Sequence, residues 1–167
     1  VLSEQQIAEV CARIGSDLTK DLKDEEMLPV MVGVMNGALP FFTDLIKKVD
    51  CHFYIDFIHI SSYAGTKSTG VVQLRKDISF DLEGRTVVVV EDIVDTGLSM
   101  EYLLNHVKSK RPKRIILVSL FDKILARKND VKVDYAGVTL DEIKFLVGYG
   151  LDYNDLFRGT SYVKNLS

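Results

Sequence analysis

The sequence has few cysteines, no long apolar run and no excess of basic residues. Cys11 and Cys51 are its only cysteines, and their positions on an apolar helix face and at a strand start indicate buried free thiols rather than a disulfide framework. No apolar run reaches transmembrane length, and residues 1–6 lack a signal-peptide pattern. A net charge of −3 disfavours non-specific binding to nucleic acid. We therefore expect a cytoplasmic protein with no membrane or nucleic-acid partner.

The size and composition of the chain are those of one globular domain. Its 167 residues suffice for a substantial core. We find no internal repeat, low-complexity tract or linker, and 47% hydrophobic and 27% charged residues are typical of soluble proteins. We therefore expect a single domain over residues 1–167.

The most informative segment is Val87–Ser99, with the sequence VVVVEDIVDTGLS. Four consecutive valines are typical of a central parallel strand that is covered on both faces. From Leu98 to Lys108, apolar residues recur at helical spacing. The segment therefore predicts a buried strand, a short turn and a helix, and ligands of open α/β sheets bind at such turns.

The turn has the chemistry of a phosphate site. Gly97 lets the backbone approach a ligand closely. Backbone N–H groups at a helix start favour an anion, and Thr96 and Ser99 can add hydroxyl donors. Glu91 and Asp92 instead suit a divalent cation or the hydroxyl groups of a ribose. Together these residues indicate a site for a sugar phosphate.

The acids of this segment also have a simpler interpretation. Carboxylates at a strand end are often part of a solvated turn and a helix N-cap. That interpretation accounts for a single aspartate, but not for a buried strand, an acid pair, an Asp-Thr-Gly turn and a helix in succession. We therefore favour the sugar-phosphate site, with the reacting centre near Asp95.

The pattern of apolar and turn residues predicts the other elements. Ser3 and Gln6 form the pattern of a capping box at the start of a first helix. Expected strands are 29–34, 51–60, 71–74, 85–91, 114–121, 135–140 and 145–149, and the later helices are 39–47 and 98–108. Strands that alternate with helices predict an α/β fold with a parallel sheet. The polar stretch 61–70 is expected to be a mobile loop.

Residues 89–99 resemble the phosphoribosyl-pyrophosphate (PRPP) binding motif of type I phosphoribosyltransferases. Further motifs, in the same order along nearly the whole chain, resemble the 6-oxopurine (hypoxanthine-guanine) members of that family. These motifs are Gly33–Ala38, Phe41-Phe42, Asp44-Leu45, Ser62-Tyr63, Ser68-Thr69-Gly70, Lys123, Phe145–Tyr149 and Leu151–Arg158.

The resemblance implies the type I phosphoribosyltransferase fold, in which helices flank a five-stranded parallel core and a small C-terminal hood covers the active site. The hood is expected to come largely from about residues 134–167. A lid from about residues 61–70 would exclude water from the reaction. Ser62 and Tyr63 match the lid residues of the family.

The resemblance also assigns roles to individual positions. Residues expected to bind PRPP and its phosphate are Glu91, Asp92, Asp95, Thr96, Gly97, Leu98 and Ser99. Those expected to bind pyrophosphate are Met35, Asn36, Gly37 and Arg158, and those expected to bind the purine are Ile93, Lys123, Phe145, Leu146 and Asp152. Lys123 would donate a hydrogen bond to the 6-oxo group, and Phe145 would stack on the ring.

Asn36 departs from the family pattern. The family usually carries Lys or Arg at this position, so the chain loses a positive charge there but keeps its backbone contacts. In the family the peptide before this residue can be cis, and the corresponding bond here is Met35–Asn36.

The implied reaction is a step of purine salvage. PRPP would transfer its 5-phosphoribosyl group to N9 of hypoxanthine or guanine, which gives IMP or GMP and pyrophosphate. Mg²⁺ would be the cofactor, with Glu91, Asp92 and Asp152 near it. Asp95 would be the general base or hydrogen-bond partner at purine N7, and we expect it to be buried, because burial makes a carboxylate more basic.

Two other functions fit parts of the sequence. A PRPP-sensing transcription regulator shares the fold, but the chain shows no added helix-turn-helix and no basic stripe. An enzyme that prefers xanthine also fits these motifs, because the sequence does not determine the contacts at C2 that distinguish xanthine from guanine. His52, His59 and His106 match no motif and are expected to be structural or surface residues. Since the family forms dimers and tetramers, we expect a homodimer or homotetramer.

Overall fold

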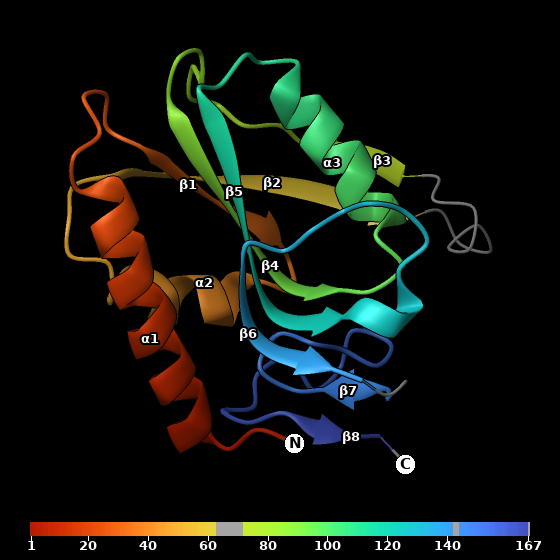
Figure 1. Ribbon diagram of the computed structural model, residues 1–167. Coiled ribbons are helices and arrows are strands. Elements are labelled where there is room, and N and C mark those ends of the chain that lie inside the picture. The colour runs from red at the N-terminus through yellow and green to blue at the C-terminus, as the bar shows by residue number, and fades with distance from the viewer. Residues whose placement is uncertain (63–71, 142–143, 167) are drawn as a thin grey trace.

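The computed structural model describes residues 1–62, 72–141 and 144–166 (Figure 1). Its helices are α1 (Glu4–Leu22), α2 (Leu39–Ile46), α3 (Leu98–Lys108) and the 3-10 helix η2 (Ile124–Ala126). Its strands are β1 (Val30–Met35), β2 (Tyr54–Ser62), β3 (Val72–Lys76), β4 (Thr86–Val94), β5 (Arg114–Lys123), β6 (Tyr135–Leu140), β7 (Leu146–Val147) and β8 (Lys164–Asn165).

The first six strands form one sheet in the order β3-β2-β1-β4-β5-β6. The strands from β2 to β6 in this order are parallel, and β3 adds an antiparallel edge strand to β2. The expected α/β fold with a parallel core is therefore confirmed. β6, which begins the segment 134–167, pairs with β5 and so belongs to the main sheet, whereas β7 and β8 form a separate antiparallel pair.

Strand β4 is buried on both faces, as its four valines predict. Val87 and Val89 pack into the apolar cluster that includes α3 residues. Val88 and Val90 pack into the cluster on the other face, which includes residues of α1 and α2. All four side chains are completely buried, and full burial of a valine contributes roughly 1.5–3 kcal/mol relative to exposure. Figure 1 shows α3 on one side of the sheet and α1 and α2 on the other.

Helix α1 begins with the expected capping box. The Ser3 hydroxyl oxygen accepts from the Gln6 N–H at 3.2 Å, and the Gln6 side chain accepts from the Ser3 N–H at 2.9 Å. The predicted apolar stripe, Ile7, Val10, Cys11, Ile14 and Leu18, is buried. Both cysteines are free, with Cys11 buried and Cys51 only half-buried.

Most expected strands differ from the observed ones by one to three residues at an end, and two of these differences have a clear local cause. β4 continues to Val94 because it stays paired with β5 through Val94 and Asp122. The expected strand 145–149 is only Leu146–Val147, since Gly148 and Tyr149 have φ angles of 102° and 52°, which an extended strand excludes.

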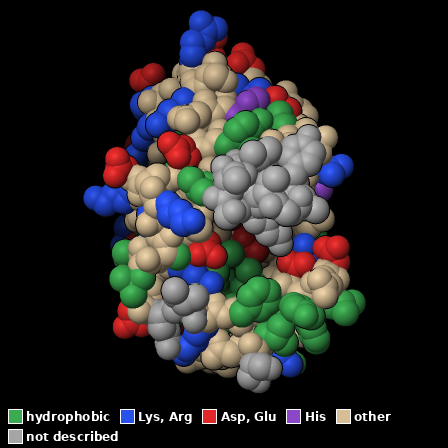
Figure 2. Space-filling view, turned by 90° about the vertical axis from the view of Figure 1, so that its right-hand side faces the viewer, with side chains coloured by type: hydrophobic (Ala, Val, Ile, Leu, Met, Phe, Trp, Pro, Cys, Tyr) green, Lys and Arg blue, Asp and Glu red, His purple; other side chains and the backbone are tan. Residues whose placement is uncertain are grey.

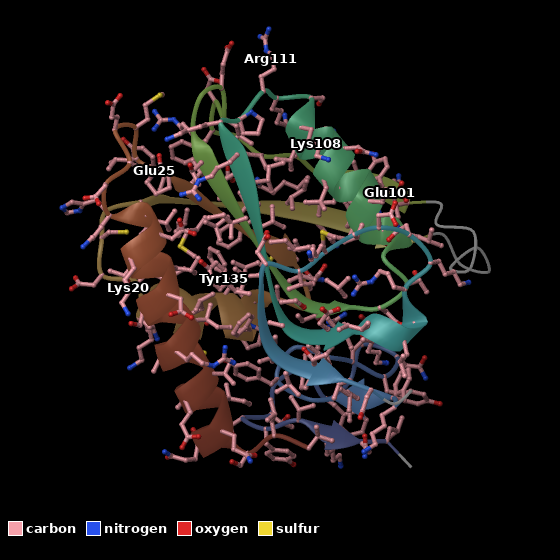
Figure 3. The ribbon with its side chains drawn as sticks, in the orientation of Figure 1. Lys20, Glu25, Glu101, Lys108, Arg111 and Tyr135 are labelled. Carbon is pink, nitrogen blue, oxygen red and sulfur yellow. The ribbon has the colours of Figure 1, made fainter. Side chains whose placement is uncertain are left out.

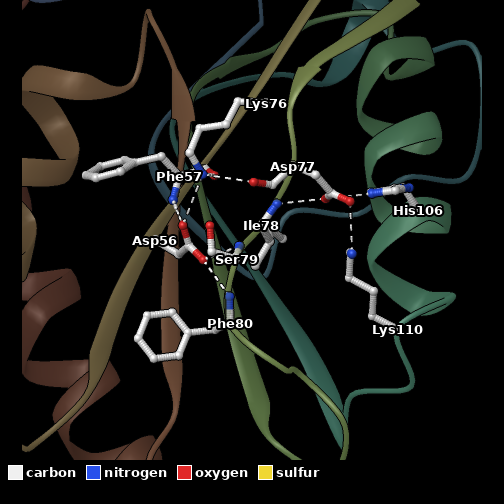
Figure 4. A network of polar contacts seen from close by, with 9 residues as sticks. All are labelled: Asp56, Phe57, Lys76, Asp77, Ile78, Ser79, Phe80, His106 and Lys110. Atoms are coloured by element: carbon white, nitrogen blue, oxygen red, sulfur yellow. Dashed lines mark hydrogen bonds and ion pairs between the residues drawn. The ribbon is translucent and has the colours of Figure 1, made fainter.

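Two carboxylates fix the chain that follows β3 (Figure 4). Asp77 accepts hydrogen bonds from His106 at 2.8 Å and Lys110 at 3.0 Å, which ties this segment to α3. Asp56 accepts from Lys76 at 3.3 Å. Its other donors are the N–H groups of Phe57, Ser79 and Phe80. Burial raises the pKa of Asp56, but these hydrogen bonds outweigh it and the net pKa lies below the ordinary value.

The C-terminal part of the chain is held to both the N-terminus and α2. The N-terminal amine donates to the carbonyl oxygen of Val163 at 2.9 Å, and Leu2 forms a β-bridge with Val163. The Tyr149 hydroxyl donates to Asp44 of α2 at 2.6 Å. No helix in the described ranges combines the length and the apolar character that a membrane crossing requires.

Glu25 anchors the end of α1 to the amino ends of β4 and β5 (Figure 3). Its carboxylate accepts from Lys113 at 2.8 Å, from Thr86 at 2.7 Å and from Arg114 at 2.9 Å. Only 7% of its side chain is exposed. These hydrogen bonds, that of Lys113 first, lower the pKa of Glu25 from 4.5 to about 2.

The Glu25→Gln variant is expected to lower the free energy of unfolding at pH 7 by about 1.5–3 kcal/mol, the range for hydrogen bonds to charged groups. Because the folded state depresses the pKa of Glu25, the difference from wild type is full above pH 4.5 and disappears as the pH falls toward about 2. Urea unfolding at several pH values measures the loss of stability at pH 7 and its dependence on pH.

Glu83→Gln is the matched control. Glu83 lies 3.6 Å from Arg111 with 59% of its side chain exposed, and such exposed pairs contribute little. An equal loss in the two variants, or a Glu25→Gln loss that does not depend on pH, would contradict this account.

Candidate active site

A cavity of about 490 Å³ lies at the carboxyl ends of β1, β2 and β4. This volume suits a small-molecule ligand. The described residues that line it are 34–37, 59–61, Val72, 91–97, Ser99, Met100, Asp152, Asp155 and Arg158. In Figure 2 acidic side chains gather around a hollow on this face of the molecule, and hydrophobic side chains border it.

Parallel pairing explains why segments far apart in sequence meet here. β1 lies between β2 and β4, so the chain leaves all three strands at the same edge of the sheet. Met35, at the end of β1, is in register with His59 of β2. His59 also lines the cavity, although it matches no motif of the sequence. The sequence signal that could have placed His59 here is its position near the end of a predicted strand.

The predicted phosphate turn connects β4 to α3. Val94 ends the strand, Asp95 and Thr96 follow, and Gly97 precedes the first residue of α3 with a left-handed φ of 88°. These residues and Ser99 line the cavity. Leu98 is the first helical residue and lies outside the described lining, although its N–H donates to the Thr96 hydroxyl oxygen at 3.3 Å.

The acid pair is held by the backbone of its own strand. The Asp92 N–H donates to the Glu91 carboxylate at 2.8 Å, and the Ile93 N–H donates to the Asp92 carboxylate at 2.7 Å. Burial, followed by the charge of Asp92, raises the pKa of Glu91 well above its ordinary value. A cation placed beside the pair would favour the ionised form of Glu91.

The loop after β1 is packed between the acid pair and the C-terminal segment around Gly150. Its Met35–Asn36 peptide bond is cis. A Cβ on Gly37 would lie 2.2 Å from an Asp92 carboxylate oxygen, and the Gly37 carbonyl oxygen lies 2.0 Å from where a Cβ on Gly150 would be. Only glycine permits these close approaches. The loop, the acid pair and the C-terminal segment are therefore in direct contact.

Arg158 is the one Lys or Arg among the described lining residues. Its guanidinium donates to the Gly150 carbonyl oxygen at 2.6 Å and lies 3.5 Å from Asp152 and 3.3 Å from Asp155. Asp152 and Arg158 are among the predicted site residues, whereas Asp155 is not. The signal for Asp155 was its position between these two in one short turn, where its N–H also donates to the Asp152 carboxylate at 2.8 Å.

Two of the predicted purine-binding residues line the cavity, and a third, Lys123, lies next to the lining residue Asp95. The Lys123 side chain is only 10% exposed, and its ammonium group donates to the Lys144 carbonyl oxygen at 2.7 Å and lies 3.9 Å from Asp95. Phe145 follows Lys144 and is 54% exposed, with its ring edge-on to Tyr153 at 6.0 Å. The side chain of Leu146 is buried. Of the predicted purine-binding residues, Ile93 and Asp152 line the cavity itself.

Asp95 and the expected lid residues differ from their predicted positions or lie partly outside the described residues. We expected a buried Asp95, but 55% of its side chain is exposed, because it follows the last residue of β4 at the open edge of the sheet. Of the two expected lid residues, Ser62 ends β2, and Tyr63 lies outside the described residues.

The charges of the cavity suit a ligand that brings its own cation. Five carboxylates, those of Glu91, Asp92, Asp95, Asp152 and Asp155, line it with one arginine. Such a surface repels a phosphate unless a cation intervenes. The described residues contain no cluster of three or more His, Cys, Asp or Glu that could hold a metal ion. Mg²⁺ shared between one or two carboxylates and ligand phosphates fits this donor set.

Comparison with known proteins places the chain in a family. The model of the phosphoribosyl transferase domain matches residues 1–154. A hypoxanthine-guanine phosphoribosyltransferase of Staphylococcus epidermidis is 38% identical over 167 residues, which cover 99% of this chain and 92% of that protein. Another, from Bacillus subtilis, is 39% identical over 164 residues, which cover 98% of this chain and 89% of that protein.

The fold agrees with this comparison. A solved structure of a hypoxanthine phosphoribosyltransferase from Staphylococcus aureus matches with a TM-score of 0.94 at 38% identity, and the match covers 100% of this chain and 90% of that one. The chain therefore belongs to the phosphoribosyltransferase family, among its hypoxanthine-guanine phosphoribosyltransferases.

Proposed function

We propose that this protein transfers the 5-phosphoribosyl group of PRPP to N9 of hypoxanthine or guanine, which yields IMP or GMP and pyrophosphate. One observation carries the proposal: a single cavity joins the phosphate turn, the acid pair and the loop after β1, with Lys123 beside it. The relatives reported above are named as transferases of this kind, so a transcription regulator has no support from them.

The parts of PRPP have separate places in the cavity. The 5′-phosphate binds the turn 95–99, where backbone N–H groups and hydroxyls converge at the start of α3. Glu91 and Asp92 hold the ribose hydroxyl groups. The pyrophosphate lies against residues 35–37 and Arg158, whose fork of donors suits a polyanion.

We further propose Mg²⁺ as the cofactor, near Glu91, Asp92 and Asp152. When bound, it neutralises charge on the pyrophosphate leaving group. The chain's own contribution is electrostatic: as the bond between C1′ and the pyrophosphate oxygen breaks, positive charge develops at C1′, and the carboxylates of Glu91 and Asp92 stabilise it.

The purine is recognised beside Asp95. Lys123 donates to the 6-oxo group, which excludes an amino group at that position. Phe145 stacks on the purine ring from its exposed position, Ile93 packs on the other side, and the backbone of Leu146 contacts the base edge. As N9 bonds to C1′, Asp95 accepts the proton or hydrogen bond at N7.

The proposal also covers the domain organisation, the location in the cell and the oligomeric state. Residues 1–167 act as one domain, with a lid at about residues 61–70 that includes Ser62 and Tyr63. A hood comes largely from about residues 134–167, although β6 within this range belongs to the main sheet. The protein works in the cytoplasm as a homodimer or homotetramer, without nucleic-acid or membrane partners.

A spectrophotometric assay with PRPP, Mg²⁺ and one base at a time tests the reaction. We expect turnover of hypoxanthine or guanine but not of adenine, with xanthine as the comparison for contacts at C2. EDTA is expected to abolish turnover, and excess Mg²⁺ to restore it. Binding of PRPP without turnover of any of the four bases would refute the proposal and favour a sensing role.

The base assignment is tested by Asp95→Asn, which keeps the shape of the side chain but cannot accept a proton. We expect kcat to fall by about 10²–10⁴-fold, the usual contribution of general acid–base catalysis, while the KM for PRPP changes little. Asp130→Asn is the matched control, because Asp130 is exposed and outside the cavity. Full turnover by Asp95→Asn would eliminate the assignment.

The role of Lys123 is tested by Lys123→Met, which keeps the length of the side chain but removes the donor. We expect kcat/KM for hypoxanthine to fall by roughly 10–100-fold, the equivalent of a hydrogen bond from a charged group, with the KM for PRPP nearly unchanged. Lys108→Met, on the exposed side of α3, is the control. A loss confined to the KM for PRPP would speak against purine recognition.

A further inference from the structure

A second loop supports the phosphate turn from outside the cavity. Residues 127–129 follow the 3-10 helix η2 and lie against residues 95–97. The Arg127 guanidinium donates to the Asp95 carbonyl oxygen at 3.2 Å, and the Lys128 N–H donates to the Thr96 carbonyl oxygen at 2.8 Å. Residues 127, 128 and 129 thus each donate a hydrogen bond to one carbonyl group of residues 95–97, and Asn129 donates to that of Gly97.

Asn129 makes the third of these contacts with its side chain. Its amide donates to the Gly97 carbonyl oxygen and to the Glu101 carboxylate, both at 2.9 Å. Its side-chain oxygen accepts from the Val131 N–H at 3.2 Å. The Gly97 oxygen also accepts the N–H of Glu101 at 2.8 Å, so both of its lone pairs are used. The Asn129 side chain therefore joins the turn, the first turn of α3 and its own loop.

These contacts determine which way the turn presents its N–H groups. In a planar trans peptide the C=O and the following N–H point in opposite directions. With the carbonyl groups of residues 95–97 bound to the 127–129 loop, the N–H groups of Thr96, Gly97 and Leu98 point away from that loop. Among the described residues, those of Thr96 and Gly97 have no hydrogen-bond partner in the protein. They are available to an anion.

Asn129 also occupies the space next to Gly97. A Cβ on Gly97 would lie 2.3 Å from the Asn129 side-chain oxygen and 2.7 Å from Arg127 Cδ. The left-handed φ of 88° at Gly97 already excludes most other residues. The turn and the Asn129 side chain therefore fit against each other without room for adjustment.

We propose that Asn129 is a positioning residue for the 5′-phosphate: through the Gly97 carbonyl group it orients the N–H groups of the turn toward that phosphate. Asn129 is absent from the cavity lining, so its effect is indirect. The inference rests on the proposed function, because it assigns the turn to the 5′-phosphate of PRPP. It predicts a defect limited to the phosphoribosyl end of the ligand.

The test compares two ligands that use different parts of the cavity. Isothermal titration calorimetry measures binding of ribose 5-phosphate and of pyrophosphate, each with Mg²⁺, to wild type, Asn129→Ala and Asn129→Leu. The leucine variant keeps nearly the same volume, so it removes the hydrogen bonds without leaving a gap. We expect both variants to bind ribose 5-phosphate about three- to tenfold more weakly, the equivalent of one lost hydrogen bond, and to bind pyrophosphate as wild type does.

Steady-state kinetics supplies a second readout. The KM for PRPP is expected to rise by a similar factor in both variants, while the KM for hypoxanthine does not change. Asn105→Ala is the matched control, because Asn105 is exposed on α3 and away from the turn. Thermal unfolding of each variant reports whether it is folded.

The outcomes separate the two proposals. Wild type that neither binds PRPP nor turns over a purine refutes the proposed function. Wild type that is active, with folded variants that bind ribose 5-phosphate normally or lose pyrophosphate affinity equally, overturns the role of Asn129 and leaves the proposed function intact.

Discussion

The pairing of β4 between β1 and β5 is the constraint on which the rest of the structure depends. Four buried valines allow this strand to be covered by α3 on one face and by α1 and α2 on the other. Because its neighbours run parallel to it, the turns that follow β1 and β4 leave the sheet at one edge. Every contact of the candidate site forms at that edge.

The site that results is acidic, although its proposed ligand is a polyanion. The acid pair of β4 and the carboxylates of Asp152 and Asp155 line the same cavity as the phosphate turn. The two kinds of group suit different parts of one ligand: N–H groups suit a phosphate, and carboxylates suit hydroxyl groups, a cation or developing positive charge. Burial, and after it the charge of the neighbouring Asp92, raises the pKa of Glu91 well above its ordinary value.

Local sequence signals predicted most of the fold, and together with the family resemblance they named most of the residues that line the cavity. The capping box, the valine run and the Asp-Thr-Gly turn each depend on neighbouring residues, and the structure contains all three. Predicted residues from the turn, the acid pair, residues 35–37, Asp152 and Arg158 line one cavity. The errors have a common cause: the end of β4, the place of His59 and the exposure of Asp95 depend on partners distant in sequence.

The sequence by itself determined the type of each long element and the chemistry of the turn after β4, because hydrophobic periodicity and turn residues act over short distances. Only the tertiary structure decided which groups meet. Gly37 packs against Asp92 and Gly150, and Asn129 holds the carbonyl group of Gly97. These contacts join residues that are tens of positions apart, so their geometry follows from strand pairing and packing rather than from any local pattern.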